Sequence, residues 1–243
     1  MPPGKAKRQP PRERAPAAAP PPTSRRKSPA RRDRRCYGQF CGLAKALDAV
    51  GERWTLLLVR DLMLGPKRFG DLQRGLDGLA PNLLAARLKE MEAAGLIGKV
   101  DAPGGRSPAY ALAQAGRELE PALHALGQWG FRFLSRPDPR DRKELAWGLF
   151  ALKRRYRGTE GTRVAEIRCE GRRFQFRLDG PRVELREGGE ALPDVLLEAE
   201  GDAFRALFFR GESAAGLKRA GKLACAGSPA DLDAFLNAFG LKP

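Results

Sequence analysis

Three side chains in the middle of the chain, Asn82, Arg87 and Lys89, carry functional groups that proteins use to bind nucleic acids. An arginine guanidinium can donate two hydrogen bonds to guanine, and an asparagine amide can pair with adenine. A lysine ammonium binds phosphate as a point charge. With Ala85 among them, these residues make a surface of small and basic side chains that can enter a groove of DNA. The chemistry they predict is recognition rather than bond making.

A helix over residues 81–94 is expected to carry these side chains. Pro81 suits the first helical position, where its missing N–H is no loss, and Gly95 supplies a C-terminal stop. An apolar set at helical spacing should form the buried face: Leu84, Leu88 and Met91. Asn82, Ala85, Arg87 and Lys89 are then expected on or near the opposite side.

Three shorter helices are expected earlier in the chain, over residues 43–50, 54–62 and 69–76. Each has apolar residues at helical spacing, and Gly65-Pro66 separates the second from the third. Lys67 and Arg68 come just before the third helix. They are therefore placed to bind backbone phosphates and to position the protein.

The residues after Gly95 predict a β-hairpin wing and a terminal helix. Residues 96–100 and 109–112 are expected to be strands, joined by a turn rich in glycine and proline. Arg106 lies at the tip of that turn and suits the minor groove or its phosphates. A final helix over residues 114–134 carries more apolar surface than a peripheral helix normally exposes, so it is expected to pack on a partner subunit. Its stripe consists of Leu119, Leu123, Leu126, Trp129 and Phe133, and His124, the single histidine, is expected to pack in the same interface.

This order of residues resembles the HxlR family of winged helix-turn-helix regulators. The resemblance rests on Cys41, Ala46-Leu47-Asp48, Gly51, Arg53-Trp54-Thr55-Leu56-Leu57, Gly65-Pro66, Phe69, Leu72, Leu84, Arg87-Leu88, Glu90-Met91-Glu92, Gly95-Leu96-Ile97, Tyr110-Ala111-Leu112, Gly116 and Trp129-Gly130. It implies a homodimer whose first and last helices form the interface. Its two recognition helices would enter successive major grooves of a palindromic operator, with half-site centres roughly 34 Å apart.

Two positions depart from the usual family pattern, in which serine often stands where this chain has Ala80 and Ala85. Ala80 lacks the oxygen of a good helix N-cap, and Ala85 lacks a hydroxyl that could meet a phosphate or base edge. Cys41 occupies a position that several family members use to sense oxidants or electrophiles. Arg35 and Lys45 could lower its thiol pKa. The alternative is a small core residue without a redox role.

The sequence argues against an enzyme, a cofactor or a metal site. One histidine cannot supply a Ser/His/Asp triad or a multi-histidine metal site. The four cysteines are too scattered for a zinc site or a disulfide scaffold. The glycine pairs at Gly104-Gly105 and Gly188-Gly189 have hairpin contexts rather than the strand-to-helix context of a phosphate loop.

Positive charge is concentrated at the N-terminus. Residues 1–35 contain nine prolines and carry 12 basic and 2 acidic residues, a net of +10 out of +16 for the chain. This composition predicts a disordered basic tail, either a solubilising leader or an arm that contacts phosphates. With no long apolar stretch, we expect no secretion signal and no membrane span, and a cytoplasmic location.

The fold expected overall is α+β: the tail (1–35), a mostly helical winged domain (36–136) and a C-terminal α+β domain (145–243). In the last, a helix near 145–156 precedes antiparallel strands with turns at Glu170-Gly171 and Asp179-Gly180, then helices near 202–209 and 229–239. The second half of this C-terminal domain resembles sterol carrier protein type two domains. The resemblance rests on Asp202-Ala203-Phe204, Arg210-Gly211, Ala220-Gly221-Lys222-Leu223, Gly227-Ser228-Pro229, Leu232 and Phe235-Leu236. That resemblance implies an apolar tunnel. Phe174, Phe176, Phe204, Phe208 and Phe235 could line it, or could equally form a solid core.

Three functions remain open at this point. The leading one is a sequence-specific transcription regulator, expected to be a repressor, that binds double-stranded DNA and responds to a hydrophobic effector or to a cysteine redox event. The second is a lipid or hydrophobic-ligand carrier that uses the winged helix only to dimerise. The third is a non-specific DNA-coating protein led by the basic tail, whose binding would survive the loss of Arg87 but not the loss of residues 1–35.

Overall fold

The computed structural model describes residues 36–101, 107–134, 141–189 and 191–243. The chain divides into Met1–Cys36 and Tyr37–Pro243, and everything that follows concerns the second unit. Within it the buried apolar residues form two cores, one spanning residues 50–112 and one that lies chiefly between residues 145 and 241. The tail predicted for residues 1–35 lies outside the described residues.

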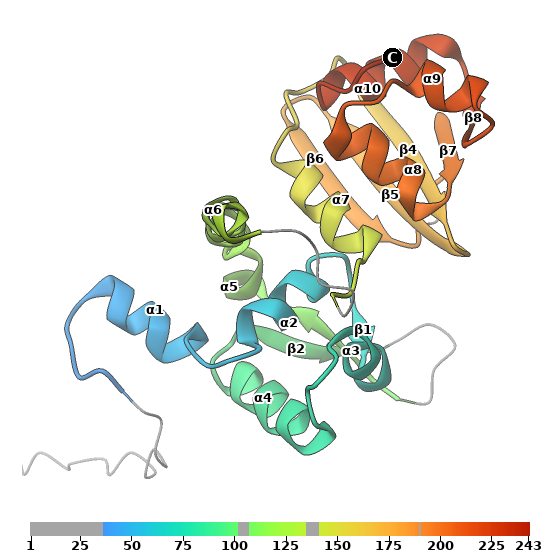
Figure 1. Ribbon diagram of the computed structural model, residues 1–243. Helices are drawn as coiled ribbons and strands as arrows, with labels where there is room; N and C mark the ends of the chain where they lie inside the picture. The colour runs from blue at the N-terminus through green and yellow to red at the C-terminus, as the bar shows by residue number, and fades with distance from the viewer. Residues whose placement is uncertain (1–35, 102–106, 135–140, 190) are drawn as a thin grey trace, which may run out of the picture. The chain divides into compact units, whose positions relative to one another are not determined.

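The first core is built from four helices and a small sheet (Figure 1). The helices are α1 (Gly42–Val50), α2 (Thr55–Leu62), α3 (Phe69–Gly75) and α4 (Pro81–Ala93). The strands β1 (Lys67–Arg68), β2 (Ile97–Val100) and β3 (Ala109–Leu112) pair antiparallel in the order β1-β3-β2. The helices and the two wing strands confirm the sequence predictions, whereas β1 was not anticipated, because two residues carry no periodicity.

The packing of this core follows the apolar spacing of the helices. Leu58 of α2, Leu72 of α3 and Leu84 of α4 are completely buried and belong to one cluster. Burying side chains of this size contributes roughly 1.5–3 kcal/mol each, so the cluster fixes how α3 and α4 are held.

The single helix predicted over residues 114–134 is wrong. The segment is divided into α5 (Gln114–Arg117), α6 (Glu120–Gly130) and the 3-10 turn η1 (Phe131–Phe133). Pro121 is the physical reason, because it lacks an N–H and fits only the first turn of a helix, where α6 begins. Gly116 allows α5 to approach β2 closely, since a Cβ there would lie 2.2 Å from the carbonyl oxygen of Leu96.

The C-terminal region is a five-stranded sheet with helices (Figure 1). Its elements are α7 (Leu145–Lys153), β4 (Thr162–Cys169), β5 (Arg172–Asp179), β6 (Arg182–Glu187), β7 (Val195–Ala199), α8 (Gly201–Arg205), the π-helical turn η2 (Ala206–Arg210), α9 (Ala214–Arg219), β8 (Leu223–Gly227) and α10 (Pro229–Ala238). The strand order is β6-β5-β4-β7-β8. The antiparallel strands expected around the turns at Glu170-Gly171 and Asp179-Gly180 are confirmed as β4, β5 and β6. The strand β7 was not anticipated, and because it pairs parallel to β4 the sheet is mixed.

Alternation along β4 and β5 assigns the two faces of this sheet. Ile167, Phe174 and Phe176 point into the core shared with α7, α8, η2 and α10. Glu166 and Gln175 are opposite each other on the other face, where the amide of Gln175 donates to Glu166 Oε2 over 2.9 Å and to the carbonyl of Ala191. Ala191, between β6 and β7, thus helps to hold Gln175 against the buried carboxylate of Glu166 on the face away from the helices.

Candidate nucleic-acid interface

One side of α4 is exposed and carries three of the residues singled out by the sequence. Asn82, Ala85 and Lys89 are all exposed, while Leu84, Leu88 and Met91 are buried. Lys89 forms no hydrogen bond or ion pair with another described residue. Asn82 uses its side-chain oxygen to accept the N–H of Leu83 over 2.9 Å, which leaves the amide NH₂ available to a ligand. The exposed face can therefore offer an amide and an ammonium to a groove.

The start of α4 has the weak cap that the sequence predicted. Ala80 is the N-cap residue, its backbone is extended, and its side chain makes no capping hydrogen bond. Pro81 follows in the first turn. In this first turn the side chain of Asn82, rather than that of the N-cap residue, accepts an N–H group, that of Leu83.

The prediction that Arg87 lies on the exposed side is wrong. Arg87 is 8% exposed, its Nη1 donates to Glu90, and its Nη2 lies 3.2 Å from Glu52 Oε2. Its Nε is buried without a partner among the described atoms. The reason is position: Arg87 follows Leu84 by three residues and precedes Leu88, so it shares their side of the helix. Arg87 thus ties α4 to Glu52 within the protein.

The basic residues before α3 are only partly available. Lys67 and Arg68 are half-buried, and Lys67 Nζ lies 2.5 Å from Glu187 Oε2. The backbone N–H of Arg68 donates to Asp71 Oδ2 over 3.1 Å, which helps to begin α3. Arg106 lies outside the described residues.

Sequence reasoning missed Lys99, an exposed residue on the wing strand β2. It lies 5.8 Å from the ring centroid of Tyr110 and 3.5 Å from Glu92. The strand register places Lys99 directly opposite Tyr110. The alternation of the predicted hairpin could have shown that these two side chains share a face.

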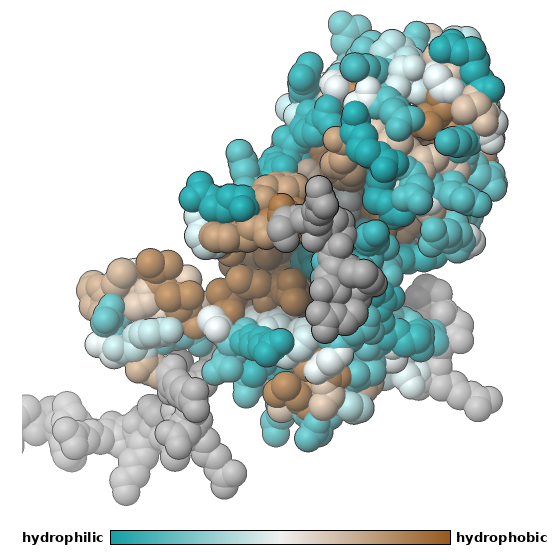
Figure 2. All heavy atoms as spheres, viewed as in Figure 1, coloured by the Kyte–Doolittle hydropathy of each residue, from teal (hydrophilic) through white to brown (hydrophobic). Residues whose placement is uncertain are grey.

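Exposed apolar side chains gather on α1 and around α6 (Figure 2). Leu43 is 69% exposed, and Trp129 is 55% exposed with its ring against Phe133 at a centroid distance of 4.8 Å. None of the residues of α6 is fully buried. The other exposed members of this apolar face are Leu47, Leu57, Leu126, Phe131, Phe133 and Leu134. A set of this size is more than an ordinary surface shows.

Comparison with known proteins settles the family of this part of the chain. The family described as HxlR-like helix-turn-helix matches residues 49–138. An uncharacterized HTH-type transcriptional regulator of Mycobacterium tuberculosis is 41% identical over 99 residues, which are 40% of this chain and 61% of that protein. The HTH-type regulator YkvN of Bacillus subtilis is 33% identical over 91 residues, covering 37% of this chain and 77% of YkvN. The chain belongs to the HxlR-like helix-turn-helix family.

A solved structure is also similar in sequence to part of this chain. The quinone-bound form of YodB from B. subtilis is 28% identical, covers 38% of this chain and 99% of that one, and has a TM-score of 0.34. The chain spans about three fifths of the length of the M. tuberculosis relative. The matched HxlR region ends at residue 138, before α7 begins. The resemblance of the C-terminal region to sterol carrier proteins stays a prediction.

Cys41, which the sequence suggested as a redox sensor, lies immediately before α1. It is exposed and unbridged. The backbone amides of Ala44 and Leu43 stabilise its thiolate and lower the pKa of the Cys41 thiol. Arg35, one of the two residues that the sequence suggested as a cause, lies outside the described residues. The lowering found in the structure comes from N–H groups of the first helical turn and not from Lys45.

The phenylalanines proposed as a tunnel lining in the C-terminal region are packed together. Phe174, Phe176, Phe204, Phe208 and Phe235 are each at most 1% exposed. The rings of Phe204 and Phe208 stack at 5.4 Å, and those of Phe176 and Phe235 lie edge to face at 5.9 Å. The structure thus places all five in the core. His124, expected at a subunit interface, stacks on Phe150 of its own chain at 4.4 Å.

Two kinds of feature are absent among the described residues. Their His, Cys, Asp and Glu side chains form no group of three that could hold a metal ion. Their helices include none with the length and apolar character needed to cross a membrane.

Proposed function

We propose that this HxlR-type regulator binds a palindromic operator as a homodimer, with α4 of each subunit in a major groove. The observation that supports this most directly is the exposed side of α4, which presents Asn82 and Lys89 around the small Ala85. An amide can read a base edge, an ammonium can bind phosphate, and a methyl group allows close approach. A helix of this width fits the major groove of B-DNA.

The dimer is supported by the apolar face on α1 and α6. Burying Leu43, Trp129 and their neighbours against a second copy would remove these side chains from water at roughly 25 cal/mol per Å². A two-fold axis at this face would repeat the recognition helix, so an operator with two half-sites about one helical turn apart is expected.

Repression is the mode of regulation we propose. A dimer that covers two major grooves on one face of a promoter would exclude other proteins from the same stretch of DNA. Arg68, Lys99 and the basic residues 1–35 would add phosphate contacts that strengthen binding without reading sequence.

A thiol switch is a second element of the proposal, and the lowered pKa of Cys41 favours it. A larger thiolate fraction near neutral pH makes this sulfur the preferred nucleophile for an electrophile. An adduct on Cys41 would lie next to Leu43, and so beside the apolar face proposed for the dimer. Modification would then weaken DNA binding through the subunit contact.

Selection from random duplex DNA tests the proposed function. The purified full chain is incubated with a pool of random duplexes at increasing salt, and the retained fraction is sequenced. Enrichment of an inverted repeat with half-sites about 10 base pairs apart is expected. Retention without enrichment, lost as salt rises, would instead show a non-specific electrostatic binder.

A further inference from the structure

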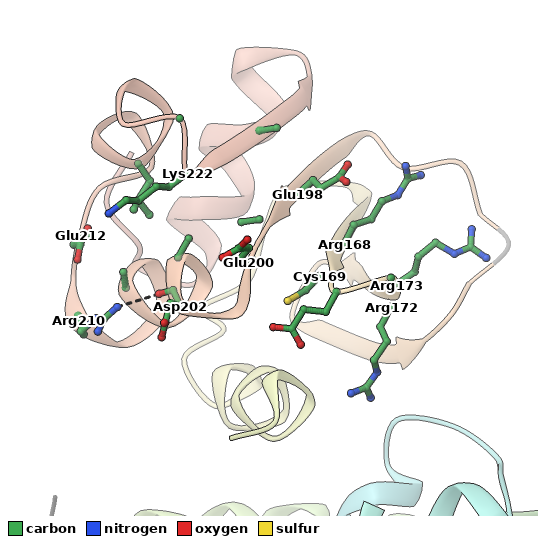
Figure 3. A pocket seen from close by; sticks show the side chains of 18 residues that line it. Arg168, Cys169, Arg172, Arg173, Glu198, Glu200, Asp202, Arg210, Glu212 and Lys222 are labelled. Carbon is green, nitrogen blue, oxygen red and sulfur yellow. Dashed lines mark hydrogen bonds between the residues drawn. The ribbon is translucent and has the colours of Figure 1, made fainter. Parts of the chain in front are cut away.

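The C-terminal region contains a cavity of about 990 Å³ at one end of its sheet (Figure 3). It lies where β4 and β7 end, between the β4–β5 turn on one side and α8, α9 and the start of β8 on the other. All its lining residues lie between positions 168 and 224, so the cavity belongs wholly to this region. None of the five phenylalanines proposed from the sequence is among them.

The cavity combines a small apolar floor with a charged rim. The floor is formed by Cys169, Ala199, Ala203, Ala206 and Leu217. The rim carries basic and acidic side chains in equal number: Arg168, Arg172, Arg173, Arg210 and Lys222 against Glu170, Glu198, Glu200, Asp202 and Glu212. Which of these charges are already neutralised decides what the cavity can bind.

Most of the basic side chains are used within the protein. Arg168 Nε donates to Glu166 over 2.6 Å, and Arg172 donates to Glu187 and Glu144 over 2.8 and 2.7 Å. Arg210 donates to the backbone carbonyl of Asp202 over 3.0 Å. In Figure 3 the guanidinium groups of Arg168 and Arg173 point away from Glu200 and Asp202. The basic groups therefore contribute little free positive charge to the interior.

Fewer of the acidic side chains are paired with other groups of the protein. Asp202 is held by Arg205, 2.7 Å away. The side-chain carboxylates of Glu170 and Glu200, in contrast, form no hydrogen bond or ion pair with any other described residue. They approach the cavity from two sides, Glu170 from the β4–β5 turn and Glu200 from the start of α8, and a Cβ built on Gly201 would lie 3.1 Å from Glu170 Oε1. Two carboxylates that form no ion pair with another described residue therefore line the cavity near the beginning of α8.

Cys169 belongs to the apolar floor of the cavity. It is 5% exposed and is part of the hydrophobic core of this region. Figure 3 shows its sulfur on the side of β4 that faces Glu200. Burial, followed by the charge of Glu170, raises the pKa of this thiol. A buried free thiol behaves as a small apolar group, so this part of the cavity suits the hydrocarbon part of a ligand.

We propose that this cavity binds a small organic ammonium ion, with the ammonium between Glu170 and Glu200 and an apolar body on Cys169, Ala199 and Ala203. An ammonium can donate to both carboxylates and satisfy their negative charge, while the alanines accept a hydrocarbon surface. A metal ion is a poorer fit, because the described residues provide no group of three ligands there. An anion would have to approach the two free carboxylates.

In the proposed regulator this cavity would be the effector site, where the ligand alters DNA binding. Only this effect on DNA binding rests on the proposed function. Ligand binding itself is measured on the full chain without DNA. A failure to bind ligand and a failure to bind an operator are therefore separate results.

Calorimetric titration with three probes that share a phenethyl group tests the proposal. Phenethylamine, phenethyl alcohol and hydrocinnamate share an aromatic body and differ in charge. We expect phenethylamine to bind with a millimolar or lower Kd, the alcohol to bind at least about tenfold more weakly, and the carboxylate to bind least. No binding of phenethylamine, or equal binding of all three probes, would overturn the proposal.

Variants identify the site within the same measurement. Glu170→Gln and Glu200→Gln change exposed side chains without altering size, and each should weaken phenethylamine binding about tenfold. Glu160→Gln, another exposed glutamate that lies away from the cavity, should leave the affinity unchanged. Unchanged affinity in both cavity variants would show that the amine binds elsewhere and that the assignment is wrong.

Discussion

Arg87 of α4 and Glu52, which lies between α1 and α2, form an ion pair with 3.2 Å between Nη2 and Oε2. The guanidinium is 9% exposed, whereas the two carboxylates it binds, those of Glu52 and Glu90, are about half exposed. This pair ties the recognition helix to the segment that follows α1. A residue that resembles a base-reading arginine in sequence is thus a structural link.

Arg87→Ala should lower the free energy of unfolding by about 1–3 kcal/mol, because it removes buried stem packing and the tie to Glu52. Urea denaturation measures this directly. Well below the melting temperature, the folded variant should keep operator affinity within a few-fold of wild type. A loss of affinity without a loss of stability would show that Arg87 contacts DNA after all.

Lys89→Ala should weaken DNA binding about tenfold at low salt without changing stability, because Lys89 is exposed and has no ion-pair partner among the described residues. The slope of log affinity against log salt should fall by about one per subunit, as expected for one lost phosphate contact. Fluorescence anisotropy at several salt concentrations measures both. Lys218→Ala, an exposed lysine of α9, is the matched control and should change neither quantity.

Trp129→Glu and Leu43→Glu should each weaken the dimer at least about thirtyfold, because each puts a charge into the apolar face. Sedimentation equilibrium gives the dissociation constant. Leu192→Glu changes a leucine that is 92% exposed on the β6–β7 connection and should leave the dimer intact. If all three variants sediment as wild type, the apolar face is not the subunit interface.

Cys41 should react with iodoacetamide at lower pH than Cys169 and Cys225, the two cysteines of the C-terminal region. Backbone amides lower the pKa of Cys41, whereas burial raises the pKa of Cys169 and of Cys225. Mass spectrometry of the native protein, labelled at several pH values, follows each site separately. Cys41→Ser should abolish any effect of labelling on DNA binding, and a persistent effect would move the switch to another residue.

Acid should destabilise the C-terminal region through Glu166. Burial alone would raise the pKa of this carboxyl, but hydrogen bonds from Gln175 and Arg168 outweigh it and lower the pKa. A lowered pKa in the folded state gives stability that is present above the unfolded value of about 4.3 and is lost as pH falls through the folded value. Thermal unfolding between neutral pH and about pH 3 should therefore show a steeper acid loss in wild type than in Glu166→Gln. Glu184→Gln, at an exposed position on β6, should follow wild type.

The helices of the winged region could be read from the sequence because apolar spacing and glycine or proline boundaries agree there. The buried side of α4 was predicted correctly from Leu84, Leu88 and Met91, and the end of the helix was predicted from Gly95. The side of Arg87 was misjudged, because an arginine next to a buried stripe can also turn inward when acidic partners are near. Glu52 is 35 residues away, so no local pattern contains it.

The sheet of the C-terminal region was only half predictable. The β4–β5–β6 meander follows from alternation and from two short turns, whereas β7 and β8 were missed, because parallel pairing with β4 depends on contacts far apart in sequence. The phenylalanines were recognised as apolar, but pattern alone does not distinguish a lining from a core. The charged cavity was not anticipated, since its residues come from seven separate elements and the turns between them.

Asn82 offers the most direct test of sequence reading by α4. An operator obtained by selection and a duplex with altered half-sites are titrated with wild type and with Asn82→Ala. Wild type should prefer the operator by at least about a hundredfold, and the variant should lose about tenfold of that preference while binding the altered duplex as wild type does. Equal affinity of wild type for the two duplexes would contradict the central claim that this chain reads DNA sequence through α4.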